Sequence, residues 1–305
     1  MARIDPTRIY DRDPEALVYA QLVRLEMPRR VLVVSERSGM GKTDFLRKLR
    51  LESTRDHAIP VALVHLDNFE SRPDEALIVD MINDELTRTG AELPNYARLR
   101  AAHRMKDVLR FAEELKEVQG LVDMTAAVIE GGAPKIAGIM YNITAETFVM
   151  PPWDEDMDAQ AKSMCVQAFL ADLTNYASQH PLALMFDAID KAEEDILEWI
   201  ISELVSRRAL REWEQRKLVI VLAGVEVAEL VLGRLHIDQR EYVEQLPGFA
   251  EWDADQLKGF LEANDLGGLS QEELTALSLL LGSGRHSLMD VVLEAGAWLR
   301  RRRHD

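Results

Sequence analysis

Residues 36–43 have the composition and spacing of a loop that binds phosphate groups, and we call them the phosphate loop. They lie in the stretch VLVVSERSGMGKTDFLRKLR, residues 31–50, where Gly41, Lys42 and Thr43 are consecutive. Backbone N–H groups at a helix start bind anions, a lysine reaches the β- and γ-phosphates, and a threonine hydroxyl ligates Mg²⁺. The residues expected to contact a nucleotide are Ser38, Gly39, Met40, Gly41, Lys42, Thr43 and Asp44.

The phosphate loop departs from the usual pattern G-x-x-x-x-G-K-[ST] at its first position, where this chain has Glu36. Gly39 and Gly41 still allow the backbone to approach a phosphate closely. Glu36 would add a like charge near a nucleotide unless its side chain points away. The strand–loop–helix context favours a site for ATP or ADP with Mg²⁺, with Thr43 as one metal ligand, over an ordinary turn between a strand and a helix.

A second group of candidate residues follows the apolar run at residues 182–186. Asp187 comes directly after this run, and Asp190 follows three residues later. Carboxylates at the carboxyl end of a parallel strand lie at the edge where open α/β sheets bind ligands. We therefore expect Asp187 to hold Mg²⁺, and Asp190 to orient or deprotonate the attacking water. The alternative for Asp187 is a cap at the start of a helix.

Apolar runs alternate with amphipathic segments along residues 1–246. This alternation predicts an α/β fold: a mostly parallel five-stranded sheet, covered on both faces by helices. The expected strands are residues 31–34, 61–66, 182–186, 218–222 and 242–246. The expected helices are residues 14–25, 44–51, 74–89, 93–119, 154–178 and 193–208.

Strand signals stop after Pro247, and three helices are expected near residues 253–264, 270–281 and 287–302. We interpret them as a small helical lid, so that the domains are residues 1–246 and 247–305, with an inserted region at about 92–150. Residues 120–150 are poor in charge and are either a hairpin or a mobile insertion. Pro247 and Gly248 supply a turn at which the lid could be hinged.

The composition limits the classes of function. The chain has 305 residues, is 47% apolar and carries a net charge of −17, which disfavours nucleic-acid binding by phosphate neutralisation. The single cysteine, Cys165, excludes a disulfide framework and lies in a helical pattern typical of a core. No stretch resembles a signal peptide or a membrane span, so a cytoplasmic protein is expected.

The order of these segments resembles that of STAND-type NTPases, signalling ATPases related to the AAA and NACHT groups. The resemblance covers about residues 7–295. RIYDRDPEA resembles the entry F-V-G-R-E-x-E of that family, and SGRHSLM resembles its G-x-P segment, with His286 in the proline position. The other matching segments are RSGMGKT, LMFDAID, KLVIVLAG and LPGFAEWDADQLKGFLEANDL. The resemblance implies that Arg12 and His286 contribute to nucleotide binding.

The resemblance favours a nucleotide-dependent switch with slow ATP hydrolysis, whose lid controls contact with a protein partner or another copy of the chain. Compact bacterial members of the family are associated with immunity or stress signalling. Two alternatives stay open: an interaction module with a degenerate nucleotide site, and an AAA-type ATPase acting on DNA or protein. After the strand at 218–222, Ala223 and Gly224 offer no side chain to sense the γ-phosphate.

Overall fold

The computed structural model describes residues 12–67, 69, 72–107, 110–118, 153–206, 217–246, 249, 254–263, 266–282 and 288–302. The chain divides into two compact units, one formed by Met1–Arg72 with Pro181–Asp305 and the other by Pro73–His180. The region predicted at residues 120–150 and the turn at Pro247 and Gly248 lie outside the described residues. The domain boundary after residue 246 stays a prediction.

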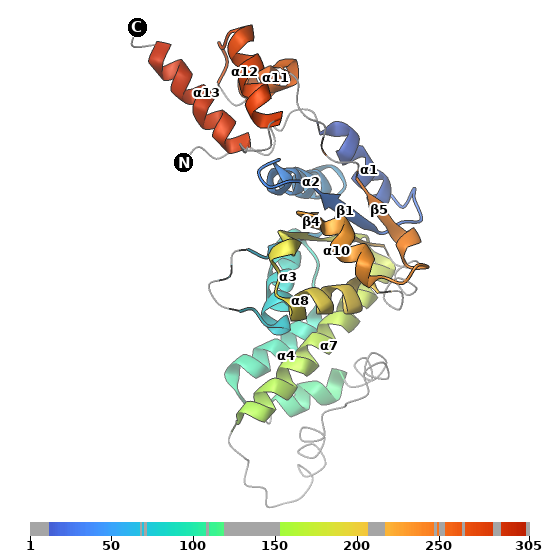
Figure 1. The fold of residues 1–305 in the computed structure, drawn as a ribbon. Helices are drawn as coiled ribbons and strands as arrows, with labels where there is room; N and C mark the ends of the chain where they lie inside the picture. Colours follow the sequence, from blue (N-terminus) through green and yellow to red (C-terminus); the bar gives the residue numbers. More distant parts are fainter. Residues whose placement is uncertain are drawn as a thin grey trace, which may run out of the picture. The chain divides into compact units, whose positions relative to one another are not determined.

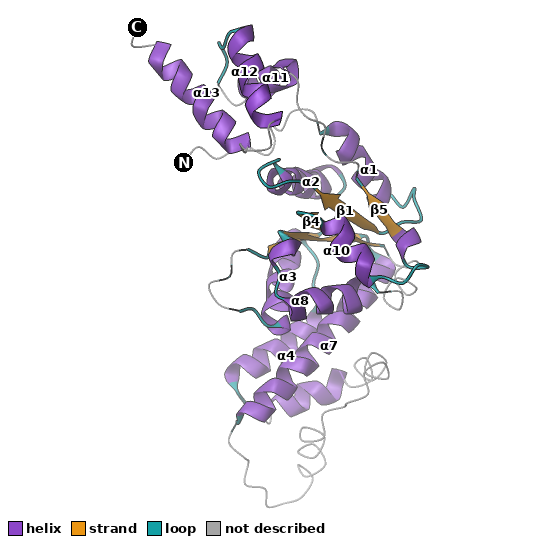
Figure 2. Ribbon diagram, in the orientation of Figure 1, coloured by secondary structure: helices purple, strands orange, loops and turns teal. Residues whose placement is uncertain are grey.

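The first unit contains a five-stranded sheet in which every described strand pair is parallel (Figure 1, Figure 2). The strand order is β2-β3-β4-β1-β5, so β1 lies between β4 and β5. The apolar runs form strands because nearly every residue in them is buried, as expected for a sheet covered on both faces. The strands are β1 (Val31–Ser35), β2 (Val61–His65), β3 (Leu182–Asp187), β4 (Leu218–Gly224) and β5 (Val243–Gln245).

Two helices, one of which follows the phosphate loop directly, cover one face of the sheet. α1 (Asp13–Val23) and α2 (Lys42–Asp56) share one hydrophobic cluster with every second residue of the strands, including Leu32, Leu63 and Met185. The elements that follow β3 and β4 are short: η2 (Ile189–Lys191), α8 (Glu194–Trp199), α10 (Val227–Arg234) and η4 (Arg240–Tyr242). The predicted α/β fold, with a mostly parallel five-stranded sheet and a strand–loop–helix unit formed by β1, the phosphate loop and α2, is confirmed.

Two predicted helices differ from the structure. The helix expected at residues 93–119 is interrupted after Met105, where Lys106 has φ of 50°, and a separate helical segment covers residues 110–118. The expected continuous helix at residues 193–208 is α8 followed by a π-helical segment, η3 (Ile200–Val205). Ile200, Ile201, Leu204 and Val205 are all buried, so this segment packs its apolar side chains into the core. Residue spacing alone does not distinguish this geometry from an ordinary helix.

The C-terminal helices are α11 (Ala254–Ala263), α12 (Gln271–Gly282) and α13 (Leu288–Arg302). They form their own hydrophobic cluster, which confirms the amphipathic pattern expected for them. Met40 of the phosphate loop packs against this cluster as well as against the cluster of the sheet. The buried members of the cluster formed by the C-terminal helices are Leu257, Phe260, Leu261, Leu274, Leu277, Leu281, Val291, Val292 and Ala295.

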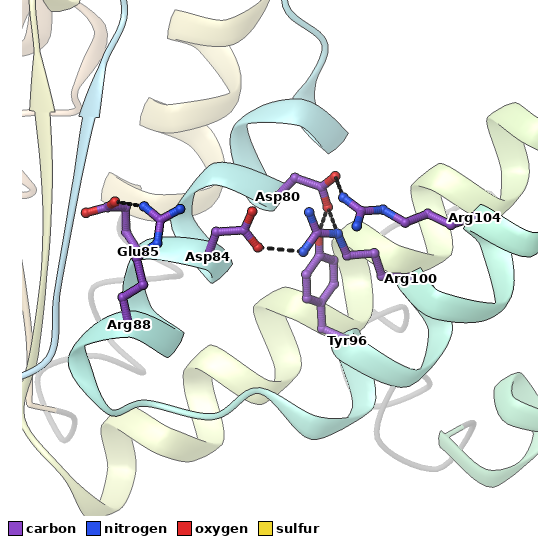
Figure 3. Close-up of polar contacts among 7 residues, drawn as sticks. All are labelled: Asp80, Asp84, Glu85, Arg88, Tyr96, Arg100 and Arg104. Carbon is purple, nitrogen blue, oxygen red and sulfur yellow. Dashed lines mark hydrogen bonds and ion pairs between the residues drawn. The ribbon is translucent and has the colours of Figure 1, made fainter.

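The second unit is helical in its described residues, with α3 (Glu75–Thr89), α4 (Pro94–Met105), a helical segment at 110–118 and α7 (Glu155–Gln179). α3 and α4 are joined by a polar network (Figure 3), in which Asp80 accepts a hydrogen bond from the Tyr96 hydroxyl. Arg100 contacts Asp80 at 2.5 Å and Asp84 at 2.7 Å. This network links α3 to α4 and involves no residue of the phosphate loop.

Cys165 lies in α7 and is buried, and burial raises the pKa of its thiol to about 12. It is therefore a core residue, as the helical pattern predicted. Among the described segments, none of the helices combines the length and the apolar character that crossing a membrane requires.

Candidate phosphate-binding site

The phosphate loop turns the chain from β1 into α2 through two glycines. Gly39 has φ of 80° and Gly41 has φ of 85°, both in the left-handed region that side chains rarely adopt. α2 then begins at Lys42, so Lys42 and Thr43 occupy its first turn. The first N–H groups of any helix have no carbonyl partner within it, which makes this turn a ready site for an anion.

Lys42 lies across the phosphate loop. Its Nζ donates hydrogen bonds of 2.7 Å to the carbonyl oxygens of both Glu36 and Arg37, and the residue is only 9% exposed. Burial lowers the pKa of the ammonium below its ordinary value, although the nearby carboxylates of Asp190 and Asp187 oppose the shift. An ammonium has three N–H donors, so one remains beyond these two bonds. A buried cation with a donor to spare fits a phosphate group.

Thr43 and Asp187 are 144 residues apart in sequence and meet at the carboxyl edge of the sheet. The Thr43 hydroxyl donates a hydrogen bond of 2.6 Å to Oδ2 of Asp187, which leaves the lone pairs of Thr43 Oγ1 available to a cation. Asp187 Oδ1 accepts a bond of 3.0 Å from the N–H of Ala188. A threonine hydroxyl and a carboxylate are both oxygen ligands of the kind that Mg²⁺ prefers, so the residues present fit this ion.

His65, at the end of β2, is a further partner of Asp187 and was not identified from the sequence. Its Nδ1 lies 3.0 Å from Asp187 Oδ2. Burial would raise the pKa of the Asp187 carboxyl, but the hydrogen bonds from His65 and Thr43 outweigh burial and hold the pKa below its usual value. Asp187 is therefore an ionised carboxylate, although it is only 4% exposed.

Asp190 is turned toward the end of β4. Its Oδ1 accepts a hydrogen bond of 2.9 Å from the N–H of Val225, and its Oδ2 lies 3.5 Å from Lys191 Nζ. Gly224 makes this approach possible, because a Cβ at that position would lie 2.3 Å from Asp190 Oδ1. The packing of Asp190 therefore explains why β4 ends in a glycine, which has no side chain. The catalytic role expected for Asp190 stays a prediction.

The carboxylate of Glu36 accepts hydrogen bonds from two backbone N–H groups, and its Oε1 receives one of 2.9 Å from Arg37. Its Oε2 accepts a hydrogen bond of 2.6 Å from the N–H of Phe249, between β5 and the C-terminal helices. The Phe249 ring contacts Phe45 edge-on, with centroids 5.3 Å apart, and the Arg12 guanidinium lies 4.2 Å from its centroid. Arg12 also pairs with Glu15 at 3.5 Å. Arg12 and Glu36 therefore both contact Phe249.

The other residues that the sequence predicts for the site are Ser38, Met40, Asp44 and His286. Ser38 is exposed, and Met40 packs between the two hydrophobic clusters described above. Asp44 accepts a hydrogen bond of 2.8 Å from Arg47, one turn later in α2. His286 lies outside the described residues, so its expected role stays a prediction. The structure therefore brings together Lys42, Thr43, Asp187 and Asp190 at one edge of the sheet.

Sequence reasoning missed His65 and the Glu36–Phe249 bond for different reasons. His65 is the polar residue that ends an apolar strand, as Asp187 is, and this shared position was the available signal. The bond from Phe249 to Glu36 spans 213 residues, and no local pattern marks it. In the described parts of the chain, no cluster of three His, Cys, Asp or Glu side chains forms a separate metal site.

No protein-family model matches this chain, and no curated protein sequence does either. Among solved structures, the chain is similar to Cdc6p from Pyrobaculum aerophilum, with 16% identity and a TM-score of 0.45 over 91% of this chain and 56% of that one. It is also similar to the ORC2 protein of Aeropyrum pernix, solved in complexes with ADPNP and ADP, with 14% identity and a TM-score of 0.44. That match covers 93% of this chain and 67% of the ORC2 chain.

Proposed function

We propose that this chain binds ATP or ADP with Mg²⁺ at the phosphate loop, hydrolyses ATP slowly, and uses the bound nucleotide as a switch. The observation that carries the proposal is the hydrogen bond of 2.6 Å between Thr43 and Asp187, beside the buried ammonium of Lys42. This arrangement joins a helix N-terminus, a cation and two oxygen ligands at one edge of the sheet. Each of these groups meets a different part of a nucleotide–metal complex.

The residues of the site have separate tasks in this proposal. Bound ATP–Mg²⁺ would supply the γ-phosphoryl group and the cation that neutralises its developing charge. The N–H groups of residues 38–43 and the third N–H of Lys42 bind phosphate oxygens. Thr43 and Asp187 hold the metal from the sheet edge, and the bond between them keeps both oxygens in place.

The switch is proposed because the phosphate loop contacts the chain that leads to the C-terminal helices. Glu36 binds the N–H of Phe249, and Met40 packs against the hydrophobic cluster of α11, α12 and α13. A nucleotide that reorders the loop would therefore act on this segment through two contacts. Differential affinity for two arrangements of the helices is then sufficient to shift their populations. The proposed partner is a protein, either an effector or a second copy of this chain.

A second candidate is a module that binds nucleotide without hydrolysing it. The observation that favours it is the hydrogen bond of 2.9 Å by which Asp190 caps Val225. A carboxylate engaged in this way is less available to orient a water molecule. β4 offers no polar side chain in its place, because it ends at Ala223 and Gly224. Measurement of phosphate release separates this candidate from a slow ATPase.

The more specific assignments are also proposals. Membership of the STAND-type group rests on the motif resemblance, as does a place in bacterial immunity or stress signalling. Action on DNA or on a protein as an AAA-type ATPase is the competing assignment. The net charge of −17 supports a protein partner over DNA, because DNA binding depends on lysine and arginine contacts to phosphates.

Hydrogen–deuterium exchange with and without ATP–Mg²⁺ tests the switch. We expect protection at residues 36–50 and 187–190, together with a change in residues 254–302. If the change is confined to the first two segments, nucleotide has a structural role and the switch proposal is wrong. Lys42→Ala is the control, since the exchange of this variant should not respond to ATP.

A further inference from the structure

His65 stands out because it is a partly exposed polar residue at the end of a strand whose other residues are buried. Its side chain is 24% exposed, whereas that of Asp187 is 6% exposed. His65 belongs neither to the phosphate loop nor to the group of carboxylates that follows β3. Its contact with Asp187 therefore needs a reason of its own.

The backbone of the sheet builds this contact. β2 and β3 are parallel neighbours, and His65 is the direct partner of Asp187 in their register. The N–H of Leu66 donates a bond of 3.0 Å to the carbonyl of Asp187, which fixes the pairing at the last step of the ladder. Alternate residues share one face of a strand, so both side chains lie on the face covered by α2. The sheet itself thus holds the imidazole beside the carboxylate.

The chemistry of the pair fixes the direction of the hydrogen bond. An ionised carboxylate only accepts hydrogen bonds, so His65 Nδ1 carries the proton and donates it to Oδ2, 3.0 Å away. Among the described residues, the side chains that donate to Asp187 are those of Thr43 and His65. Thr43 belongs to the first turn of the nucleotide-binding helix, whereas His65 belongs to a strand. His65 is therefore the donor that stays in place if the phosphate loop moves.

We propose that His65 is a positioning residue that holds the Asp187 carboxylate in the orientation in which it meets the divalent cation bound with the nucleotide. This inference rests on the proposed function, because it concerns the metal side of the same site. Partners that orient a metal-binding carboxylate raise metal affinity without touching the metal, and their loss typically costs about 10- to 100-fold in that affinity.

The test is a titration of Mg²⁺ in the presence of ADP, read by calorimetry or by a fluorescent ADP analogue. In His65→Leu, which removes the donor, the Mg²⁺ concentration at half-saturation should rise by about 10- to 100-fold. ADP affinity in EDTA should stay at the wild-type value. His65→Asn keeps an N–H donor near the position of Nδ1 and should restore most of the Mg²⁺ response.

Two further variants make the result specific. His180→Leu changes an exposed histidine of the second unit and should behave as wild type. If His65→Leu does not fold, His65→Gln replaces it, because its longer amide carries the donor away from the position of Nδ1. An unchanged Mg²⁺ response in the donor-free variant overturns the inference, as does an equal loss of ADP affinity in EDTA. No ADP binding by the wild type in either buffer contradicts the proposed function itself, and this inference with it.

Discussion

The carboxylate of Glu36 accepts a hydrogen bond of 2.6 Å from the backbone N–H of Phe249, at the point where the chain leaves the sheet for the C-terminal helices. Glu36 occupies the position at which phosphate-binding loops usually have their first glycine. The substitution therefore replaces a flexible residue by one that ties the loop to a distant segment. Phe249 is 6% exposed and Glu36 is half-buried, so this link is partly shielded from solvent.

Glu36→Gly should separate nucleotide binding from the response of the C-terminal helices. The variant restores the usual glycine and removes the acceptor, so it should bind ADP at least as well as the wild type. In hydrogen exchange, residues 254–302 should respond to ATP less than they do in the wild type. Glu36→Gln keeps an acceptor oxygen and should retain the response. A full response in Glu36→Gly would show that the bond to Phe249 carries no coupling.

Asp187→Asn should reduce Mg²⁺-dependent phosphate release by more than about tenfold while changing nucleotide affinity less, because the role proposed for the carboxylate is to hold the metal. Asp190→Asn is the comparison. Its amide oxygen can still accept the bond from Val225, so we expect a smaller or similar loss. Phosphate release is measured at saturating ATP. Turnover equal to wild type in Asp187→Asn would assign this residue a purely structural role.

The sequence was sufficient for the fold and for the position of some candidate site residues, because those signals are local. Four buried residues, Val31 to Val34, followed by Lys42 and Thr43, specify a strand, a loop and a helix without reference to the rest of the chain. Asp187 was found in the same way, at the end of an apolar run. These predictions depend on residue types within a few positions of one another.

The parts that could not be predicted depend on pairing between distant segments. His65 meets Asp187 only because β2 lies beside β3 in this register, and the chain contains no local sign of that order. Asp190 was predicted as a catalytic group, and its bond to Val225 depends on the space that Gly224 leaves. Strand order and side-chain clearance follow from the packing of the whole unit, which residue periodicity does not specify.

Asp172 should control the stability of the second unit. It is 3% exposed and accepts hydrogen bonds from the N–H groups of Asn95 and Tyr96, at 2.7 and 3.0 Å, at the start of α4. Asp172→Ala leaves these donors without the acceptor, and the free energy of unfolding should fall by about 1–3 kcal/mol. Asp172→Asn keeps an acceptor oxygen and should lose less. Denaturant unfolding of both variants tests this expectation.

We also expect Asp172 to make the free energy of unfolding depend on pH. Burial raises the pKa of the Asp172 carboxyl above its ordinary value, despite the hydrogen bonds from Tyr96 and Asn95. Its contribution to stability is therefore complete below the unfolded pKa of about 3.9 and is lost as pH rises through the folded pKa. Asp172→Asn does not ionise, so its stability relative to wild type should increase between about pH 4 and pH 7. A difference that stays constant over this range would contradict the shift.

The most direct test of the central claim is calorimetric titration of the wild type and Lys42→Ala with ADP and Mg²⁺. Lys42 is the buried cation of the phosphate loop, so its removal should weaken binding by about 10- to 100-fold, as expected for the loss of charged hydrogen bonds of about 1.5–3 kcal/mol. Lys258→Ala, which removes an exposed lysine of α11, should bind as the wild type does. Equal affinity in the wild type and Lys42→Ala, or no binding by the wild type, would contradict the assignment of residues 36–43 as a nucleotide site.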